Sequence, residues 1–216
     1  MHLEVLDSDR ISLLEKITYG MDFQYYMAGG TGLALQIGTR QSVDFDFFVP
    51  EHFSSQMIID KLHDISAHVC ILQNTDDTCD LSVNDVQVSF FYYPKQMVSP
   101  FVNGEEFPKL NIASVLDIGA MKLAAIGGRG AKKDFFDLYC MMKYASILPQ
   151  DLIDAARKKF PDTGMNHIIM SLTYFDDAEN EILPHTFIDD SWKTVKKFFI
   201  SAQPDFERAN LNAVIT

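Results

Sequence analysis

The sequence is poor in cysteine and in basic residues, and it contains no long apolar run. Its three cysteines among 216 residues are an odd number without a Cys-x-x-Cys pair, so they indicate neither a disulfide framework nor a zinc site. No apolar run approaches the roughly 20 residues that a membrane span needs, and charged residues interrupt the first 20 positions, unlike a secretory signal. We therefore expect a cytoplasmic protein with no membrane partner.

The charge is strongly acidic overall but uneven along the chain. Lys and Arg number 18 against 30 Asp and Glu, a formal net charge of −12. This balance argues against general attraction to nucleic acid, because phosphate binding depends on Lys and Arg. Residues 117–160 differ, with eight bases against five acids. A local site for phosphate groups is therefore compatible with the acidic total.

Hydrophobic periodicity predicts an α+β region followed by a helical region. The α+β region covers residues 1–108 and the helical region residues 109–216. We expect helices at 1–25, 32–37, 56–69, 115–126, 131–144, 151–159, 164–174 and 191–202, and strands at 25–28, 42–49, 78–83 and 86–93. The pair Asn84-Asp85 is typical of a hairpin turn between the last two strands.

Gly29, Gly30 and Thr31 form a turn between a predicted strand and a predicted helix. Two glycines let the backbone approach a ligand closely, and a helix that begins at Thr31 offers free N–H groups to a phosphate. An ordinary strand-to-helix turn is the commoner explanation for this pattern alone. The glycine turn is a candidate phosphate site only in combination with a second feature.

Asp44 and Asp46 provide that feature, on the polar side of the predicted strand 42–49. With 22 aspartates in the chain, roughly two Asp-x-Asp spacings are expected by chance. Two carboxylates on one face of an aromatic strand repel each other, and a hard cation such as Mg²⁺ relieves that repulsion. The alternative is an edge strand with a solvated acidic face. Together with the glycine turn, the pair predicts a site for a nucleoside triphosphate and its metal.

The segment YMAGGTGLALQIGTRQSVDFDFF resembles the nucleotidyltransferase signature of the AbiEii/AbiGii-type toxin family, within the DNA-polymerase-β-like superfamily. A second block, MKLAAIGGRGAKKDFFDLY, resembles later motifs of that family. The resemblance implies a mixed sheet with flanking helices, with the helical region completing the site. It implies metal ligands at Asp44 and Asp46, Mg²⁺ or Mn²⁺ as cofactor, and a triphosphate bound by Gly29, Gly30 and Thr31.

The second block adds four candidate residues. The resemblance implies catalytic roles for Lys122 and Asp137, beside Asp44 and Asp46, and cofactor binding by Arg129 and Lys133. From chemistry alone, these bases can neutralise triphosphate charge, and Asp134 or Asp137 can orient one of them. Without the resemblance, a solvated helix face with ordinary salt bridges is the favoured interpretation.

One departure from the superfamily pattern concerns a third carboxylate, which a neighbouring strand usually supplies. Here Gln87 and Ser89 occupy the corresponding polar face, and Asp80 or Asp137 are possible substitutes. We expect either a nucleotidyltransferase that modifies tRNA or a protein in a toxin–antitoxin or phage-defence setting, with a cognate antitoxin as a further partner, or a degenerate nucleotide- or partner-binding module.

Overall fold

Alternating apolar and polar residues build a mixed sheet in the first half of the chain. The computed structural model describes residues 1–215, with side chains through Ala213. The five strands have the order β1-β2-β5-β4-β3. They are β1 (Tyr26–Met27), β2 (Phe45–Val49), β3 (Val69–Asn74), β4 (Thr78–Val83) and β5 (Val86–Tyr92). β2 and β5 are parallel and the other neighbours are antiparallel, which confirms the α+β class.

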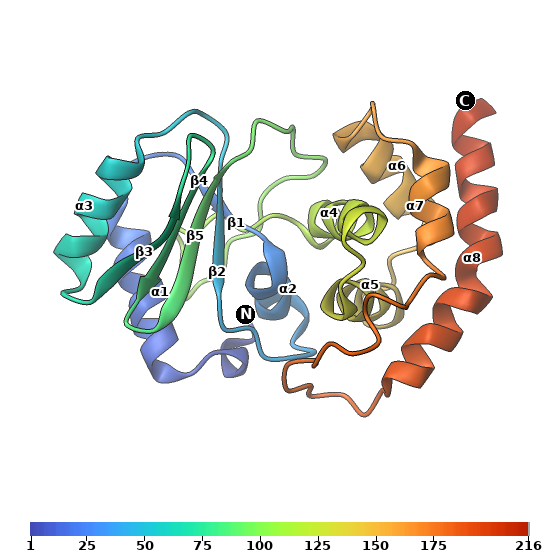
Figure 1. Cartoon of the computed structure of the whole chain (residues 1–216), viewed down its shortest axis with the longest axis horizontal. Helices are drawn as coiled ribbons and strands as arrows, with labels where there is room; N and C mark the ends of the chain where they lie inside the picture. The colour runs from blue at the N-terminus through green and yellow to red at the C-terminus, as the bar shows by residue number, and fades with distance from the viewer. Residues whose placement is uncertain (216) are drawn as a thin grey trace. The chain divides into compact units, whose positions relative to one another are not determined.

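One face of this sheet forms the core of the first half. In β2 the side chains of Phe45, Phe47 and Val49 are buried, while those between them are partly exposed. The helices α1 (Ser8–Gly20) and α3 (Ser55–Ile65) lie together on the buried face (Figure 1). Because side chains alternate along a strand, Asp46 lies on the other face. β2 has neighbours on both sides, so the alternative of an edge strand is wrong.

The predicted hairpin is confirmed. Asn84 and Asp85 have φ values of 52° and 64°, the left-handed conformation that a two-residue hairpin turn requires. The two strands pair from Val83 opposite Val86 to Thr78 opposite Phe91. This pairing fixes which side chains of β4 and β5 share a face.

Several predicted boundaries in the first half are wrong. The expected helix 1–25 is a short 3₁₀ helix, η1 (Leu3–Val5), followed by α1, because the Asp7 carboxylate accepts the N–H of Arg10 and starts a new helix. The helix expected to reach Val69 ends at Ile65, and β3 begins at Val69. β3 is an edge strand with mostly exposed side chains, so no alternation marks it in the sequence.

The strand expected from Ser42 begins only at Phe45. The backbone carbonyl groups just before β2 accept hydrogen bonds from side chains and not from a neighbouring strand. Arg10 Nε donates to the Val43 carbonyl at 2.9 Å, and the Thr31 hydroxyl donates to the Asp44 carbonyl. Asp44 therefore lies immediately before β2, and Asp46 within it.

The second half is helical, as expected. Its helices are α4 (Val115–Gly128), α5 (Lys132–Tyr144), α6 (Pro149–Lys159), α7 (Met165–Ser171) and α8 (Trp192–Ile215). α4 packs on α5, α6 and α7, and α8 packs on the same three helices. Among the residues described, no helix is both long and apolar enough to cross a membrane.

The helix α8 continues well beyond its predicted end at residue 202. Pro204 lies inside it, although proline removes one helical hydrogen bond. Phe199, Phe206 and Ala209 on one side of this helix are buried, and their packing outweighs the lost bond. Intrinsic propensity alone therefore predicts the wrong end.

The chain divides into two units. Unit 1 comprises residues 1–95 and 100–113, and unit 2 comprises residues 96–99 and 114–216. The short segment 96–99 belongs to unit 2 because the Asp117 carboxylate accepts the N–H groups of Val98 and Ser99, at 2.8 and 3.0 Å. The domain limits expected at residues 108 and 109 thus lie near the division after Ala113.

Candidate active site

The glycine turn forms the first turn of α2 (Gly29–Ile37), which begins before the predicted helix start at Thr31. Gly29 has a φ of +64°, and a Cβ atom there would lie 2.2 Å from Asp46 Oδ2. Gly30 is similarly close to another side chain, because its Cβ would lie 2.5 Å from Nη2 of Arg40. Ala28 supplies no side-chain cap to the helix. The start of α2 therefore brings the backbone of its first turn, which Ala28 does not cap, close to a carboxylate.

The aspartate pair lies on the face opposite the core. Asp44 and Asp46 are partly exposed, whereas Phe45 between them is buried. Thr31 connects this segment to α2: its side chain is buried, its hydroxyl donates to the Asp44 carbonyl, and it lies 2.8 Å from the Ser42 hydroxyl. Thr31 thus holds the pair against the start of the helix, a role that its place in the glycine turn alone does not indicate.

The place predicted for a third carboxylate holds a hydrogen-bonded row. Ser89 of β5 is in register with Asp46 on one side and with Asp80 of β4 on the other. The Ser89 hydroxyl donates to Asp80 Oδ1 at 2.8 Å, and Gln87 Nε2 donates to the same carboxylate at 2.9 and 3.0 Å. Asp80 therefore shares the face of Asp46, at a separation of two strands. The sequence could not show this, because register across strands is a tertiary property.

The donor set in unit 1 fits a hard divalent cation. Asp44 and Asp46 provide carboxylate oxygens, which Mg²⁺ and Mn²⁺ prefer, and Mg²⁺ is often held by one or two carboxylates with substrate phosphates. Within residues 1–215, no group of three or more His, Cys, Asp or Glu side chains could hold a metal. Two carboxylates fit a site in which phosphate and water supply the remaining ligands.

The candidates from the second motif lie in unit 2, and two of them, Lys122 and Asp137, belong to a buried ion-pair network. Lys122 of α4 places its Nζ atom 2.8 Å from Asp134 Oδ1 and 2.7 Å from Asp137 Oδ2. Arg129 Nε lies 2.8 Å from Asp134 Oδ2. Both carboxylates are buried, so the alternative of a solvated helix face is wrong, although its salt bridges are present. The network joins α4 to α5 and holds Lys122 between two acids.

The network also sets the protonation state of Asp134. Burial alone would raise the pKa of its carboxyl, but the charge of Lys122 and the hydrogen bonds from Arg129 and Lys122 outweigh burial and hold that pKa below its ordinary value. Asp134 is therefore ionised at neutral pH.

The two remaining cofactor candidates are exposed. The Arg129 side chain is 61% accessible although its Nε contacts Asp134, and Lys133 at the start of α5 is also exposed. The neighbouring Lys132, which no motif singles out, is buried, and its Nζ donates to the backbone carbonyls of Glu179 and Glu181. The Lys132-Lys133 pair thus contains one structural and one exposed base.

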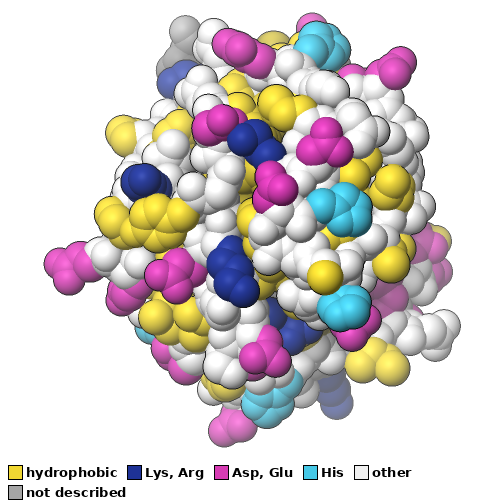
Figure 2. All heavy atoms as spheres, turned by 90° about the vertical axis from the view of Figure 1, so that its left-hand side faces the viewer, with side chains coloured by type: hydrophobic (Ala, Val, Ile, Leu, Met, Phe, Trp, Pro, Cys, Tyr) yellow, Lys and Arg dark blue, Asp and Glu magenta, His cyan; other side chains and the backbone are white. Residues whose placement is uncertain are grey.

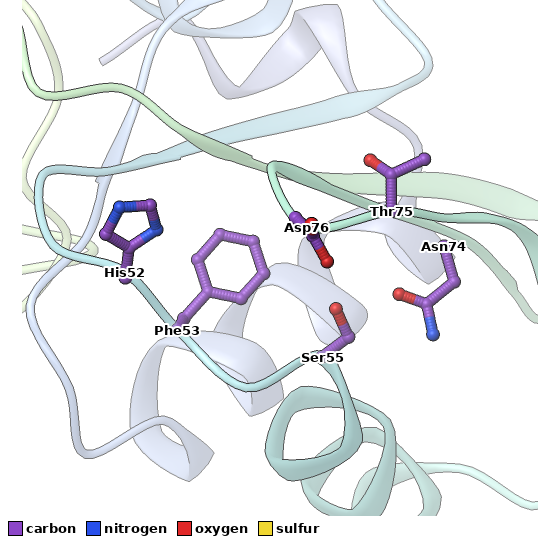
Figure 3. Close-up of a pocket in the computed structure, with 6 residues that line it drawn as sticks. All are labelled: His52, Phe53, Ser55, Asn74, Thr75 and Asp76. Carbon is purple, nitrogen blue, oxygen red and sulfur yellow. The ribbon is translucent and has the colours of Figure 1, made fainter.

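A depression elsewhere in unit 1 lies apart from these residues. It is lined by His52, Phe53, Ser55, Asn74, Thr75 and Asp76, from the start of α3 and the turn between β3 and β4 (Figure 3). The His52 ring stacks on Tyr92 with centroids 3.7 Å apart. Tyr92 alternates with Phe91 and so lies on the face of the sheet opposite Asp46. This depression contains none of the predicted site residues.

A mixed sheet that carries a glycine-started helix and two aspartates before and within the adjacent strand is a nucleotidyltransferase-like fold. A crystal structure of an H. pylori protein provisionally described as a nucleotidyltransferase matches it with a TM-score of 0.59, at 18% identity, over 96% of each chain. A Megavirus polyadenylate synthase structure matches at a TM-score of 0.45 and 17% identity, over 63% of this chain and 31% of that one.

The sequence comparison is more specific. The profile of the nucleotidyl transferase AbiEii toxin family, described as a type IV TA system, matches residues 13–212. The uncharacterized Aquifex aeolicus (strain VF5) protein aq_aa25 is 35% identical over 202 residues, which cover 90% of this chain and 94% of that protein. The chain belongs to the AbiEii nucleotidyltransferase toxin family, which confirms the resemblance found in its two motifs.

Proposed function

We propose that this protein is a metal-dependent nucleotidyltransferase that transfers a nucleotide from a nucleoside triphosphate to a hydroxyl of tRNA or of a protein. The observation that carries the proposal is the contact between the Asp46 carboxylate and Gly29 in the first turn of α2. It brings a candidate metal ligand and helix N–H groups to one place. Family membership supports nucleotidyl transfer as the class of reaction.

The glycines, Thr31 and the two aspartates of unit 1 would have separate roles in binding the triphosphate and its metal. Gly29 and Gly30 would accept the phosphates against the N–H groups of α2, and Thr31 would keep Asp44 in position. Asp44 and Asp46 would hold Mg²⁺ or Mn²⁺, which when bound neutralises phosphate charge and favours loss of pyrophosphate.

The reaction then needs little covalent chemistry from the protein. The acceptor hydroxyl oxygen forms a bond to the α-phosphorus, the bond from that phosphorus to pyrophosphate breaks, and pyrophosphate leaves with the electron pair. The hydroxyl proton passes to solvent or to a nearby carboxylate. Positioning and charge neutralisation supply most of the rate enhancement.

Four residues of unit 2 remain part of the proposal. Arg129 and Lys133 are exposed bases able to bind phosphate charge. Lys122 and Asp137 are engaged with each other, so we propose that they act as positioning residues through the α4–α5 network. The setting we propose is cytoplasmic, in toxin–antitoxin or phage defence, with a cognate antitoxin as a partner.

One observation favours a second candidate function. Ser89 occupies the place of the usual third carboxylate, and its hydroxyl is hydrogen-bonded to Asp80. A site with two carboxylates could bind a nucleotide or a partner without turnover. The two candidates differ in whether a nucleotide is transferred.

Incubation with each α-labelled triphosphate, Mg²⁺ and either purified tRNA or cell protein distinguishes them. We expect label on one acceptor with the wild type, removed by nuclease or by protease according to its nature, and none with Asp46→Asn. Asp64→Asn is the matched control, because Asp64 is an exposed aspartate of α3 in the same unit. Nucleotide binding without transfer to any acceptor would favour the second candidate.

A further inference from the structure

An aromatic row crosses the sheet next to the aspartate pair. It consists of Tyr26, Phe48 and Phe91, which are in register on β1, β2 and β5. Phe48 follows Asp46 by two positions, and Phe91 follows Ser89 by two. Residues two positions apart share a face and are separated by about 6.6 Å, so the row runs parallel to the acidic row, one repeat of the pleat away.

The rings of this row form a continuous surface. Tyr26 and Phe48 are stacked with centroids 5.6 Å apart and an interplanar angle of 20°, and the centroids of Phe48 and Phe91 are 5.4 Å apart. Tyr93 extends the surface, with its ring 5.2 Å from that of Phe48. Tyr26 is buried, but Phe48, Phe91 and Tyr93 remain partly exposed. Packing of the core on the opposite face of the sheet does not explain why these aromatic rings lie partly exposed beside carboxylates.

We propose that the aromatic row receives the base of the nucleoside triphosphate, which stacks on Phe48 and Phe91. The inference rests on the proposed function, because it places the phosphates at Gly29 and Gly30 and the metal at Asp46. One ribose separates the base of a nucleotide from its α-phosphate, and one repeat of the pleat separates Phe48 from Asp46. The aromatic row thus lies where the base of a nucleotide bound through its phosphates would reach the sheet.

The chemistry of the row also predicts its selectivity. The row offers ring faces and few polar atoms, and stacking on aromatic side chains tolerates every base because each has a π face. The row has few donors or acceptors for hydrogen bonds to base edges, and such bonds are what discriminate strongly between bases. We therefore expect the four triphosphates to bind with affinities within about tenfold of one another.

Calorimetric titration with Mg²⁺ and either ATP or inorganic triphosphate, which lacks the base, tests the proposal. We expect Phe91→Leu to weaken ATP binding by about tenfold and to leave triphosphate binding unchanged, because one stacking partner of the base is lost. Tyr92→Leu is the matched control, since it removes the adjacent aromatic ring from the opposite face and should change neither affinity. Melting temperatures of the two variants establish that both are folded.

A second readout follows the ring directly. In a Trp192→Phe background, the indole introduced by Phe91→Trp becomes the only one in the chain, and we expect its fluorescence to be quenched by ATP but not by triphosphate. Equal binding of ATP to Phe91→Leu and wild type, with binding still lost in Asp46→Asn, would overturn the aromatic site while leaving the proposed function intact. Failure of the wild type to bind either ligand would overturn both.

Discussion

The two units use carboxylates in opposite ways. Unit 1 contains 6 bases against 16 acids, a net charge of −10, whereas unit 2 contains 12 against 14, a net charge of −2. On the side of unit 1 that carries α3, acidic side chains are spread over the surface rather than gathered in one patch (Figure 2). The excess of acid in the chain therefore belongs almost wholly to the unit with the aspartate pair.

The carboxylates of the two units also differ in burial. In unit 2 the carboxylates of Asp117, Asp134 and Asp137 are buried, and each lies within 3 Å of a lysine ammonium group. In unit 1 Asp44 and Asp46 are partly exposed beside the start of a helix. Acids buried against lysines hold helices together, while partly exposed acids near the start of a helix can serve a cation and its phosphates. The same residue type thus implies different functions in the two motifs.

The largest effect should come from Asp46→Asn, which tests whether the partly exposed carboxylates of unit 1 serve nucleotide transfer. We expect nucleotide transfer to fall by about 10³-fold or more, because a charged metal ligand is lost. The free energy of unfolding should fall by less than in variants of the buried network in unit 2, because the Asp46 side chain is partly exposed. Transfer rates and urea denaturation of the same preparation measure both. A variant that loses stability rather than activity would contradict the contrast.

Lys122→Met tests whether the buried carboxylates of unit 2 stabilise the fold. Removing one partner of a buried ion pair leaves uncompensated charge and costs about 3–5 kcal/mol. Here Asp137 loses the Lys122 ammonium group, and Asp134 keeps only its contact with Arg129 among the ion pairs of the network. Urea denaturation should show this loss directly. Lys133→Met, a neighbouring exposed lysine, should change stability by less than about 0.5 kcal/mol. Equal stabilities of the two variants would show that the network does not join α4 to α5 in solution.

Gly29→Ala should have an intermediate effect on triphosphate binding and on stability. The positive φ of Gly29 costs an alanine about 1–3 kcal/mol, and the added Cβ would collide with the Asp46 carboxylate. Calorimetry should therefore show weaker binding of inorganic triphosphate with Mg²⁺, together with lower stability. The control is Gly128→Ala at the end of α4, where a Cβ would meet nothing within 4 Å. If both alanines are tolerated equally, the close approach at Gly29 is not required.

Local sequence signals predict much of the first unit. Asn84-Asp85 indicates the hairpin because only a few residue types adopt left-handed φ at both positions. Alternation from Asp44 to Val49 is enough by itself to place both aspartates away from the core. These features depend on a few adjacent residues, so a single sequence contains them.

Long-range pairing accounts for what the sequence could not predict. The hydrogen bond from Ser89 to Asp80 depends on the register of two strands, and the ion pair of Lys159 with Asp117 joins residues 42 positions apart. The sequence does not predict strand β3, because its exposed edge has no alternating burial, or the end of α8, because packing outweighs the effect of Pro204. In each case a tertiary contact decided the outcome.

The smallest expected effect is the dependence of stability on acidic pH that Asp134 contributes. Because its folded pKa lies below the ordinary value near 3.8, the stability it contributes is fully present above that value and is lost as the pH falls through the folded pKa. We expect the free energy of unfolding of the wild type to decline below about pH 4. Asp134→Asn should be less stable at pH 7 and should decline less steeply, because it has no proton to take up at this position. Urea denaturation from pH 3 to pH 7, with exposed Asp64→Asn as control, measures the two slopes. Parallel curves for Asp134→Asn and the wild type would mean that Lys122 and Arg129 do not hold this carboxyl ionised, and the contrast between the two units would lose its electrostatic basis.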